Sequence, residues 1–387
     1  MGWDWYLKIV DIVSLRKYTE NGGAVLLRLT AEIISTRPIC KEKGRYIGWP
    51  TICRRSNGEL LAVFSGDRDW HVCPWGKTEM IRSTDNGATW SKPVTINNTP
   101  LDDRDAGIIE TKDGTLVASW FTSLAFLQNL NAEYVKRAMP DRDAWVRHIE
   151  KLTPEIKEEW LGNYISRSVD GGVTWSKPIR VKLSAPHGPI ELFDGRLLYV
   201  GLNLRTKEKR EACADISTDG GVTWQTVGVI PIPESYIGWY YEPHVVETYG
   251  GKLVVLFRCQ PGDGNDYMRQ SESTDGGRTW SIPLITPIFG HPAHLLRLKN
   301  GWLLASYGLR RLPFGERACI SRDDGATWDY DQEVDICHPT GDELNYAGDL
   351  GYPASVELAD GSIYTVYYQI DQPGEKPCLM ATHWKIV

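Results

Sequence analysis

The sequence lacks the short motifs that would assign its chemistry at once. No Gly-x-Gly-x-x-Gly or Gly-x-x-x-x-Gly-Lys-Ser/Thr run follows a strand-like segment, so nucleotide binding is not indicated. His-x-His and His-Glu-x-x-His spacings are missing too, and we expect no metal site and no cofactor. The eight cysteines form no Cys-x-x-Cys pair, and Cys213, Cys259 and Cys319 lie in apolar runs typical of buried thiols.

An excess of basic residues and a long apolar run are also missing. The chain has 43 Lys and Arg against 50 Asp and Glu, and its net charge of −7 leaves no basic stripe for a nucleic acid partner. No span of 18 apolar residues occurs, and residues 1–23 carry charges early, without a clean apolar region or cleavage site. We therefore expect no membrane partner and, by default, a cytoplasmic protein. A periplasmic or secreted protein would follow if a leader had been trimmed, and the oligomeric state stays open.

What the sequence does contain is the motif Ser-x-Asp-x-Gly-x-Thr-Trp, five times. The copies are Ser83–Trp90, Ser168–Trp175, Ser217–Trp224, Ser273–Trp280 and Ser321–Trp328. Successive copies lie roughly 50 residues apart, except for 85 residues between the first two. Repeats of this period stack as similar supersecondary units, and a radial array of small sheets is the usual all-β arrangement.

A second repeat gives the number of sheets. It consists of two apolar, strand-like runs around a Gly-containing turn, a pattern typical of a β-hairpin. Its six copies begin at Trp49, Asp105, Pro186, Glu242, His291 and Tyr352. We therefore predict an all-β, six-bladed β-propeller in which each Ser-x-Asp motif lies in the outer hairpin of its blade.

Two segments depart from the repeat. The sixth hairpin has no Ser-x-Asp motif, and we predict that residues 24–39 supply its outer strand beside the C-terminal run 379–387, which would close the ring. Residues 124–162 are charged, with apolar residues at helical spacing and a Thr-Pro-Glu helix start, and predict a helical insertion in blade two. The predicted organisation is an N-terminal extension, residues 1–23, followed by one propeller domain, residues 24–387.

The innermost strands of a propeller run side by side around its axis, so their first residues converge at one end of the central channel. These residues are Trp49, Asp105, His187 (or Pro186), Glu242, His291 (or His294) and Tyr352. A channel with only a structural role would more often present small or apolar residues, so the sequence predicts a functional site at this end. His244 and His294 lie further into their strands and are expected in the core. Asp102 and Asp103, just before Asp105, are expected to be solvated.

The repeated motifs resemble the Asp-boxes of the sialidase (neuraminidase) superfamily, and the resemblance extends from about residue 45 to the end of the chain. Glu242, with Arg258 placed 16 residues later, resembles the sialidase segment that carries a catalytic glutamate and a substrate-binding arginine. The segment around Tyr352 resembles the one that carries the sialidase tyrosine nucleophile. The resemblance implies a glycoside hydrolase with these three residues in its site.

The same resemblance implies further site residues. Arg317, just before the fifth Asp-box, is the candidate for another carboxylate-binding arginine, and Arg310 and Arg311 compete for this role. The general acid of the family is an aspartate on the loop after the first inner hairpin. Here that loop contains Asp67 and Asp69, of which we favour Asp69.

One position departs from the family pattern. Sialidases usually have an arginine two residues before the proline of the first blade, and Gly48 occupies that position here. Arg45 and Arg68 are the remaining candidates for this role, although neither matches the motif. Trp49 beside the site suggests contact with a different sugar ring, either neutral or uronic.

The chemistry of a tyrosine nucleophile fits an anionic sugar. A carboxylate on the anomeric carbon repels an Asp or Glu nucleophile, whereas a neutral phenol approaches it and passes its proton to a nearby glutamate. We therefore predict an exo-acting glycoside hydrolase that removes a terminal, sialic-acid-like sugar from a glycan. Two alternatives remain: a polysaccharide lyase, in which Tyr352 or a histidine abstracts a proton from a uronate, and a non-catalytic glycan-binding propeller.

Overall fold

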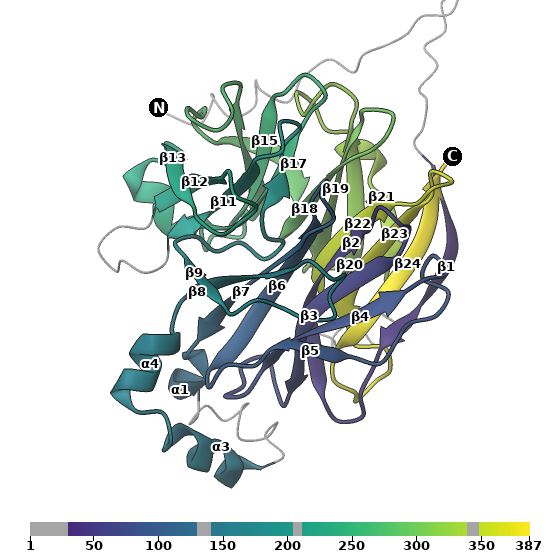
Figure 1. Cartoon of the computed structure of the whole chain (residues 1–387). Helices are drawn as coiled ribbons and strands as arrows, with labels where there is room; N and C mark the ends of the chain where they lie inside the picture. The colour runs from purple at the N-terminus through teal and green to yellow at the C-terminus, as the bar shows by residue number, and fades with distance from the viewer. Residues whose placement is uncertain (1–29, 130–140, 204–210, 339–347) are drawn as a thin grey trace, which may run out of the picture.

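The computed structural model describes residues 30–129, 141–203, 211–338 and 348–387, so the predicted extension 1–23 lies outside the described residues. Six four-stranded antiparallel sheets form the blades of a β-propeller (Figure 1). Contacts between the first strands of neighbouring blades hold the centre of the ring together. The predicted all-β, six-bladed propeller is confirmed.

The first three blades follow the chain from the inner to the outer strand. Blade one contains β2 (Tyr46–Arg54), β3 (Leu60–Arg68), β4 (Lys77–Ser83) and β5 (Val94–Asn97). Blade two contains β6 (Asp102–Glu110), β7 (Leu116–Ser123), β8 (Asn163–Ser168) and β9 (Ile179–Val181). Blade three contains β10 (Ile190–Glu191), β11 (Leu197–Asn203), β12 (Glu211–Ser217) and β13 (Gln225–Val229).

The remaining blades repeat this order, except that the last takes its outer strand from the beginning of the chain. Blade four contains β14 (Tyr240–Glu247), β15 (Leu253–Cys259), β16 (Tyr267–Ser273) and β17 (Leu284–Phe289). Blade five contains β18 (Ala293–Arg297), β19 (Leu303–Leu309), β20 (Gly315–Ser321) and β21 (Val334–Cys337). Blade six contains β22 (Gly351–Glu357), β23 (Ile363–Gln369), β24 (Cys378–Ile386) and β1 (Ala31–Cys40). Two 3-10 helices, η1 (Glu234–Trp239) and η2 (Tyr330–Gln332), lie in connections.

The pairing of β1 with β24 closes the ring. The two strands are antiparallel, from Ala31 opposite Ile386 to Cys40 opposite Leu379. Figure 1 shows the purple N-terminal strand beside the yellow C-terminal strand. The predicted closure by the N-terminal run is therefore confirmed, and it leaves the C-terminal strand without an open edge.

Each Asp-box forms the turn between the third and fourth strands of its blade. In the first box, Gly87 N donates to Ser83 Oγ at 2.9 Å, and the Asp85 carboxylate accepts from Thr89 N and Oγ1 at 2.8 and 2.6 Å. Gly87 has a φ of 81°, which glycine adopts without steric cost. Hydrogen bonds to the ionised carboxylate lower the pKa of Asp85 to about 2. The boxes are therefore structural turns.

Among the described residues between β7 and β8 of blade two lie the short helices α1 (Ala125–Asn129), α3 (Arg142–Ile149) and α4 (Pro154–Trp160). Asp141 caps α3 by accepting from Ala144 N at 2.8 Å, and Thr153 caps α4 with Pro154 in its first turn. Residues 130–140 lie outside the described ranges, so the insertion over the full segment 124–162 stays a prediction. Among the described residues, no helix has the length and apolar character needed to cross a bilayer.

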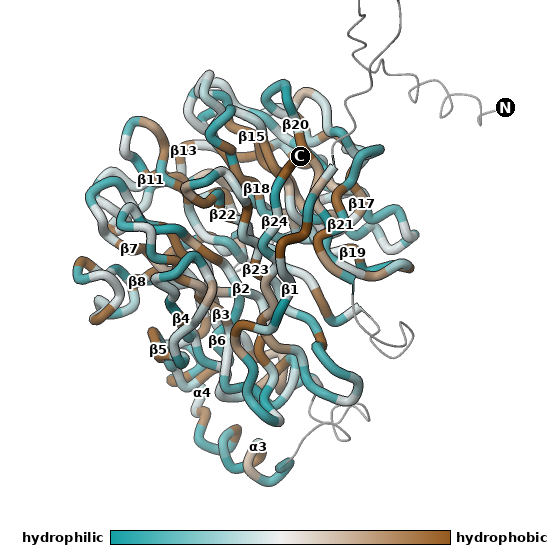
Figure 2. Tube along the Cα trace, turned by 90° about the vertical axis from the view of Figure 1, so that its right-hand side faces the viewer, coloured by the Kyte–Doolittle hydropathy of each residue, from teal (hydrophilic) through white to brown (hydrophobic). Residues whose placement is uncertain are grey.

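Apolar side chains between adjacent blades form the core. Val200 of blade three, for example, belongs to one buried cluster with Val245, Val255 and Phe257 of blade four, and the box residue Trp280 covers its edge. Figure 2 shows that hydrophobic stretches follow the strands and hydrophilic ones the outer turns. Burial of apolar surface contributes about 25 cal/mol per Å², so the blades stabilise one another and hold the inner strands in fixed positions.

Candidate active site

Four inner strands share one irregularity near the axis. At Trp49, Asp105, Glu242 and Tyr352 the pairing with the second strand shifts register, and each residue has a positive φ between 45° and 55°. A left-handed residue other than glycine costs on the order of 1–3 kcal/mol, and a bulge redirects the side chain. The repeated bulge therefore turns four chemically different side chains toward one end of the channel.

Tyr352 and Glu242 form the centre of this site. The Tyr352 hydroxyl donates to Glu242 Oε1 at 2.6 Å, and Arg258 Nη1 donates to Glu242 Oε2 at 2.7 Å. Gln260 Oε1 accepts from Arg258 Nε and Nη2 at 3.0 and 2.7 Å and fixes the guanidinium. Three residues from blades four and six are thus brought together, although 110 positions separate Glu242 from Tyr352.

The surroundings set different protonation states for the pair. Burial opposes the charged form of Glu242, but the Arg258 charge and the hydrogen bonds from Tyr352 and Arg258 outweigh it, so the pKa of this carboxyl is lowered. Burial, and then the negative charges of Glu242 and Asp105, raise the pKa of Tyr352 well above its ordinary value. At neutral pH the phenol keeps its proton, and the carboxylate beside it can accept one.

The second arginine of the site is Arg310. Its guanidinium carbon lies 5.7 Å from the centre of the Tyr352 ring, and its Nε donates to Leu350 O at 2.8 Å. The predicted Arg317 is instead buried on the third strand of blade five, where its Nε lies 2.6 Å from Asp335. Of the three arginines considered for this role, Arg310 therefore lies beside Tyr352, and the role of Arg317 in substrate binding stays a prediction. The physical reason is topological: a second strand, such as β19, ends where its antiparallel inner strand begins, and Arg310 directly follows β19.

Asp105 and His291 each carry a buried polar atom without a hydrogen-bond partner among the described residues. These atoms are Asp105 Oδ1, 3.9 Å from Arg104 Nε, and His291 Nδ1. Burial raises the pKa of Asp105 to about 7, with Arg104 opposing and Glu242 reinforcing the shift. Burial, and next two nearby arginines, lower the pKa of His291 well below its ordinary value. Unpaired buried groups are rare in native structures, so these two are available to a ligand.

The first-blade loop does not bring an aspartate to Tyr352. Asp69 is buried and accepts from Trp145 Nε1 of α3 at 2.9 Å and from Arg45. Asp67 lies 2.6 Å from Arg45 Nη2 and 2.5 Å from Lys77 Nζ. These contacts occupy Asp69, Asp67 and Arg45 with one another and with neighbouring segments, and their roles as acid and as substrate-binding residue stay predictions. The charges of Asp67 and Asp69 are paired with those of Arg45 and Lys77. The hydrogen bond from Trp145 to Asp69 anchors α3 to the propeller.

Arg68 and Trp49 support the site from beneath. Arg68 is completely buried and bonded to the equally buried Asp102 and to His71 O. The Trp49 indole is 1% exposed, and the Arg104 and Arg68 guanidinium carbons lie 4.3 and 4.9 Å from its ring centre. Both residues are buried in the structure, and their contact with substrate stays a prediction. Asp102 and Asp103 were expected to be solvated but are fully buried, because Asp102 compensates the buried Arg68 charge.

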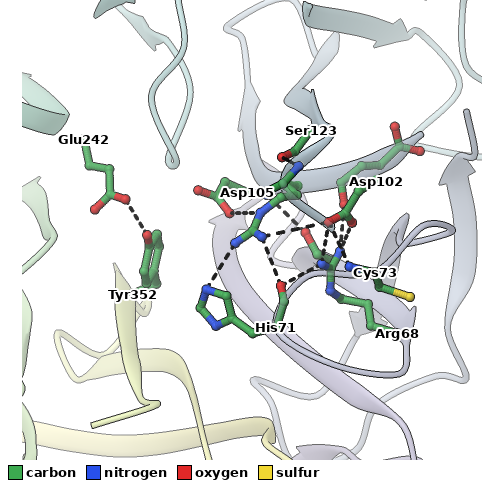
Figure 3. Close-up of polar contacts among 12 residues, drawn as sticks. Arg68, His71, Cys73, Asp102, Asp105, Ser123, Glu242 and Tyr352 are labelled. Atoms are coloured by element: carbon green, nitrogen blue, oxygen red, sulfur yellow. Dashed lines mark hydrogen bonds and ion pairs between the residues drawn. The ribbon is translucent and has the colours of Figure 1, made fainter. Parts of the chain in front are cut away.

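A second polar cluster contains His71, which the sequence offers as a possible acid or base, and Asp349, which it does not indicate. His71 Nδ1 lies 3.4 Å from Asp349 Oδ1, and the same oxygen accepts from Tyr46 Oη at 2.8 Å and Tyr368 Oη at 3.1 Å. Figure 3 shows His71 on the loop opposite the Tyr352–Glu242 pair. No sequence signal pointed to Asp349, because nothing in its spacing relates it to a loop 278 positions away.

His187 lies in the channel below these groups. It is 1% exposed, its Nδ1 lies 3.0 Å from Thr51 Oγ1, and its ring centre is 6.5 Å from that of Tyr352. The rings of His244 and His294 are 5.3 and 5.0 Å away. His187 packs among these rings, and its buried Nε2 has no hydrogen-bond partner among the described residues, so the contact of His187 with substrate stays a prediction. No group of three His, Cys, Asp or Glu side chains within the described ranges has a geometry that holds a metal ion.

The arrangement joins a neutral phenol, an ionised carboxylate and two guanidinium groups at the end of a propeller channel. It can activate a hydroxyl nucleophile and hold an anionic group beside it. Together with the five Asp-boxes, these features define an Asp-box β-propeller of the sialidase-like superfamily.

Comparison with known families agrees with this class. The BNR repeat-like domain family matches residues 139–365, more than half of the chain, and the BNR/Asp-box repeat matches residues 81–92. The chain therefore belongs to the BNR repeat-like domain family.

Two characterised relatives match parts of the chain. The xyloglucanase Xgh74A of Acetivibrio thermocellus is 31% identical over 175 residues, which are 39% of this chain and 20% of the relative. A sialidase of Paraclostridium sordellii is 21% identical over 261 residues, 62% of this chain and 58% of the relative. The chain thus spans about a fifth of the first curated relative and less than two thirds of the second.

Solved structures show the same fold over a larger share of the chain. A protein of unknown function from Dyadobacter fermentans superimposes with a TM-score of 0.73 at 24% identity, covering 92% of this chain and 99% of that one. The NanB sialidase of Streptococcus pneumoniae superimposes with a TM-score of 0.63 at 17% identity, covering 92% and 70%.

Proposed function

We propose that this chain is an exo-acting glycoside hydrolase of the sialidase-like type, which removes a terminal anionic sugar from a glycan. The observation that carries the proposal is the Tyr352 hydroxyl, 2.6 Å from Glu242 Oε1, with Arg258 and Arg310 beside the pair. A phenol that donates to an ionised carboxylate is a nucleophile with its base in place. Similarity to the Paraclostridium sordellii sialidase supports this class of reaction.

In the proposed reaction, the Tyr352 oxygen attacks the anomeric carbon while Glu242 takes the phenolic proton. The bond between the anomeric carbon and the glycosidic oxygen breaks, and the leaving oxygen receives a proton from an acid of the site. Water then attacks the same carbon, gives one proton back to that acid and displaces Tyr352, which recovers its proton from Glu242. A neutral nucleophile suits a sugar whose carboxylate would repel an aspartate or glutamate.

The two arginines favour an anionic substrate. Each charge-assisted hydrogen bond to a carboxylate contributes about 1.5–3 kcal/mol, and Arg258 and Arg310 flank the nucleophile. The third arginine of the sialidase pattern is replaced by Gly48, where even a Cβ atom would lie 3.1 Å from Tyr46 and 3.4 Å from Tyr368. Two phenol rings fill this space, so we propose a sugar acid held by two arginines and hydroxyl groups.

A screen of aryl glycosides that includes sialosides, uronides and neutral sugars tests the proposal. We expect release of the aryl group from an anionic glycoside, with a loss of about 10²–10⁴-fold in kcat for Glu242→Gln and no detectable turnover for Tyr352→Phe. Arg311→Met is the matched control, because Arg311 packs on Phe289 with its guanidinium carbon 3.5 Å from the ring centre. Turnover confined to neutral sugars would contradict the anionic substrate. Glycan binding without turnover of any glycoside would contradict the enzyme and favour a binding propeller.

A second candidate function is a polysaccharide lyase that acts on uronates. It is favoured by His71, whose Nε2 lies 3.5 Å from Arg104 Nη2. When His71 is neutral, its Nε2 can accept from Arg104, and a neutral imidazole beside a guanidinium can abstract a proton next to a bound carboxylate. A product with ultraviolet absorbance from a new carbon–carbon double bond would identify the lyase; hydrolysis without that absorbance would exclude it.

A further inference from the structure

The proposed hydrolase needs an acid for its leaving group, and the two aspartates expected on the first-blade loop are turned away from Tyr352. Asp69 is bonded to α3 and to Arg45, and Asp67 to Arg45 and Lys77. The same loop carries His71, whose side chain is 43% exposed. A leaving glycan must extend out of the channel toward solvent. The acid is therefore expected at the opening, whereas Asp105, whose Oδ1 has no hydrogen-bond partner among the described residues, is only 6% exposed.

The loop is held in place at His71 itself. The His71 carbonyl oxygen accepts from Arg68 Nη2 at 2.8 Å and from Arg104 Nη1 at 3.0 Å. The imidazole stands edge-on to the Trp49 ring, with centres 4.9 Å apart, and Tyr352 stands edge-on to the same indole at 6.5 Å. One buried tryptophan thus sets the positions of both His71 and the proposed nucleophile.

Asp349 orients the imidazole. Two phenols, Tyr46 and Tyr368, donate to Asp349 Oδ1, and His71 Nδ1 lies 3.4 Å from the same oxygen. Burial opposes the ionised form, but His71 and the Tyr46 hydrogen bond outweigh it and lower the pKa of Asp349. An ionised carboxylate at Nδ1 keeps the proton on that nitrogen and leaves Nε2 for proton exchange.

We propose that His71, oriented by Asp349, is the general acid and base of this site. The proposal rests on the proposed hydrolase function. In the first step, protonated His71 gives its Nε2 proton to the glycosidic oxygen as the bond to the anomeric carbon breaks and Tyr352 bonds to that carbon. In the second step, neutral His71 takes a proton from the attacking water as the bond to Tyr352 breaks. An anionic sugar in the site favours the protonated form that the first step needs.

The groups that face His71 determine its pH dependence. They are Asp349 before β22, Tyr46 of β2, Arg68 of β3 and Arg104 of β6. Burial first, and then Arg104, lower the pKa of His71 below 6.5, while Asp349 opposes this shift. Because the first step needs the protonated imidazole, kcat/KM for a poor leaving group falls as pH rises through this lowered pKa.

The decisive experiment compares leaving groups. For His71→Gln we expect a loss of about 10²–10⁴-fold in kcat/KM on an alkyl glycoside and less than about 10-fold on the matching nitrophenyl glycoside, whose leaving group needs no proton. His338→Gln is the matched control, because His338 forms a similar surface pair with Asp335 at 3.2 Å and is 48% exposed. For Asp349→Asn we expect the alkaline limb of the alkyl-glycoside profile to move to lower pH.

A measurement on the unmodified protein covers the case in which a variant does not fold. The alkyl glycoside should show the alkaline limb below pH 6.5, and the nitrophenyl glycoside should not. Equal losses on both substrates in His71→Gln, or the leaving-group dependence in Asp105→Asn instead, would overturn this proposal and leave the hydrolase intact. No turnover of any glycoside, or an unsaturated product, would overturn the hydrolase function itself and the proposal with it.

Discussion

Arg310 and Arg311 are adjacent in the chain, yet only Arg310 faces the nucleophile. Its guanidinium carbon is 5.7 Å from the Tyr352 ring centre, whereas Arg311 packs on Phe289. We predict that Arg310→Met lowers kcat/KM on an anionic glycoside by about 10–100-fold, as expected for the loss of one charge-assisted hydrogen bond. Steady-state kinetics on the anionic glycoside measure this loss. Arg311→Met should leave kcat/KM unchanged, and equal losses in both variants would contradict a specific role for Arg310.

The raised pKa of Asp105 leads to a prediction about how the stability of the protein depends on pH. Its folded-state pKa of about 7, against an ordinary 3.8, means that the folded protein binds more protons than the unfolded chain between these values. The contribution of this carboxyl to stability is therefore present at pH 4 and is lost as pH rises through 7. Asp105→Asn removes the titrating group and keeps a residue that tolerates a positive φ. We predict that the Tm of the variant minus that of the parent increases from pH 4 to pH 8; a constant difference would contradict the raised pKa.

For single residues, the sequence predicted the position in the fold of those that lie near the start of an inner strand. Tyr352, Glu242 and Asp105 begin inner strands, and the fold brings such positions together whatever their side chains. The general acid could not be chosen in the same way. Asp69 turns away because it bonds to Trp145, and no local pattern relates these two segments.

The bulges are the elements that form the site. Each places one extra residue in an inner strand and directs its side chain toward the axis. A proline follows Trp49, Glu242 and Tyr352 in the sequence, and a proline within a strand is typical of an edge or a bulge. Proline therefore marks three of the four bulges, whereas Asp105 is followed by alanine, but no bulge was predicted from the sequence.

The lowered pKa of the Asp-box aspartates leads to a prediction about the stability of the protein at low pH. Hydrogen bonds to the ionised form lower the pKa of Asp275 to about 2 in the folded protein, against an ordinary 3.8. Its contribution is present above the unfolded-state pKa and is lost as pH falls from about 4 to 2. We predict that Asp275→Asn lowers the Tm at pH 7 and that variant and parent converge toward pH 2. Thermal scans by circular dichroism measure this difference, and an equal deficit at both pH values would contradict the lowered pKa.

The whole molecule depends on the closure of the ring. β1 covers the edge of β24 over Ala31–Cys40, so removal of residues 1–40 exposes a strand edge in blade six. We predict a lower Tm and concentration-dependent aggregation, measured by thermal unfolding and light scattering. Removal of residues 1–29, which leaves β1 in place, is the control. A truncated protein with unchanged Tm and no aggregation would contradict the role of β1.

The number of blades was predictable because all six blades repeat the inner hairpin and five of them carry an Asp-box. The closure was predictable because the sixth hairpin has no Asp-box and needs an outer strand from elsewhere in the chain. The sequence alone could not show that Arg310, rather than Arg317, lies beside Tyr352, since this depends on which end of a strand faces the axis. The cluster of His71 and Asp349 depends on two segments from opposite ends of the chain that meet only when blades one and six become neighbours.

Trapping of the proposed covalent intermediate tests the role of Tyr352 most directly. A fluorinated anionic glycosyl fluoride, reacted with the protein and followed by peptide mass spectrometry, should add one sugar to the peptide that contains Tyr352 and inactivate the enzyme in step with labelling. Arg258→Met should label more slowly, because one of the two arginines that hold the carboxylate is lost. Steady turnover with the label on a different residue would contradict the assignment of Tyr352 as the nucleophile.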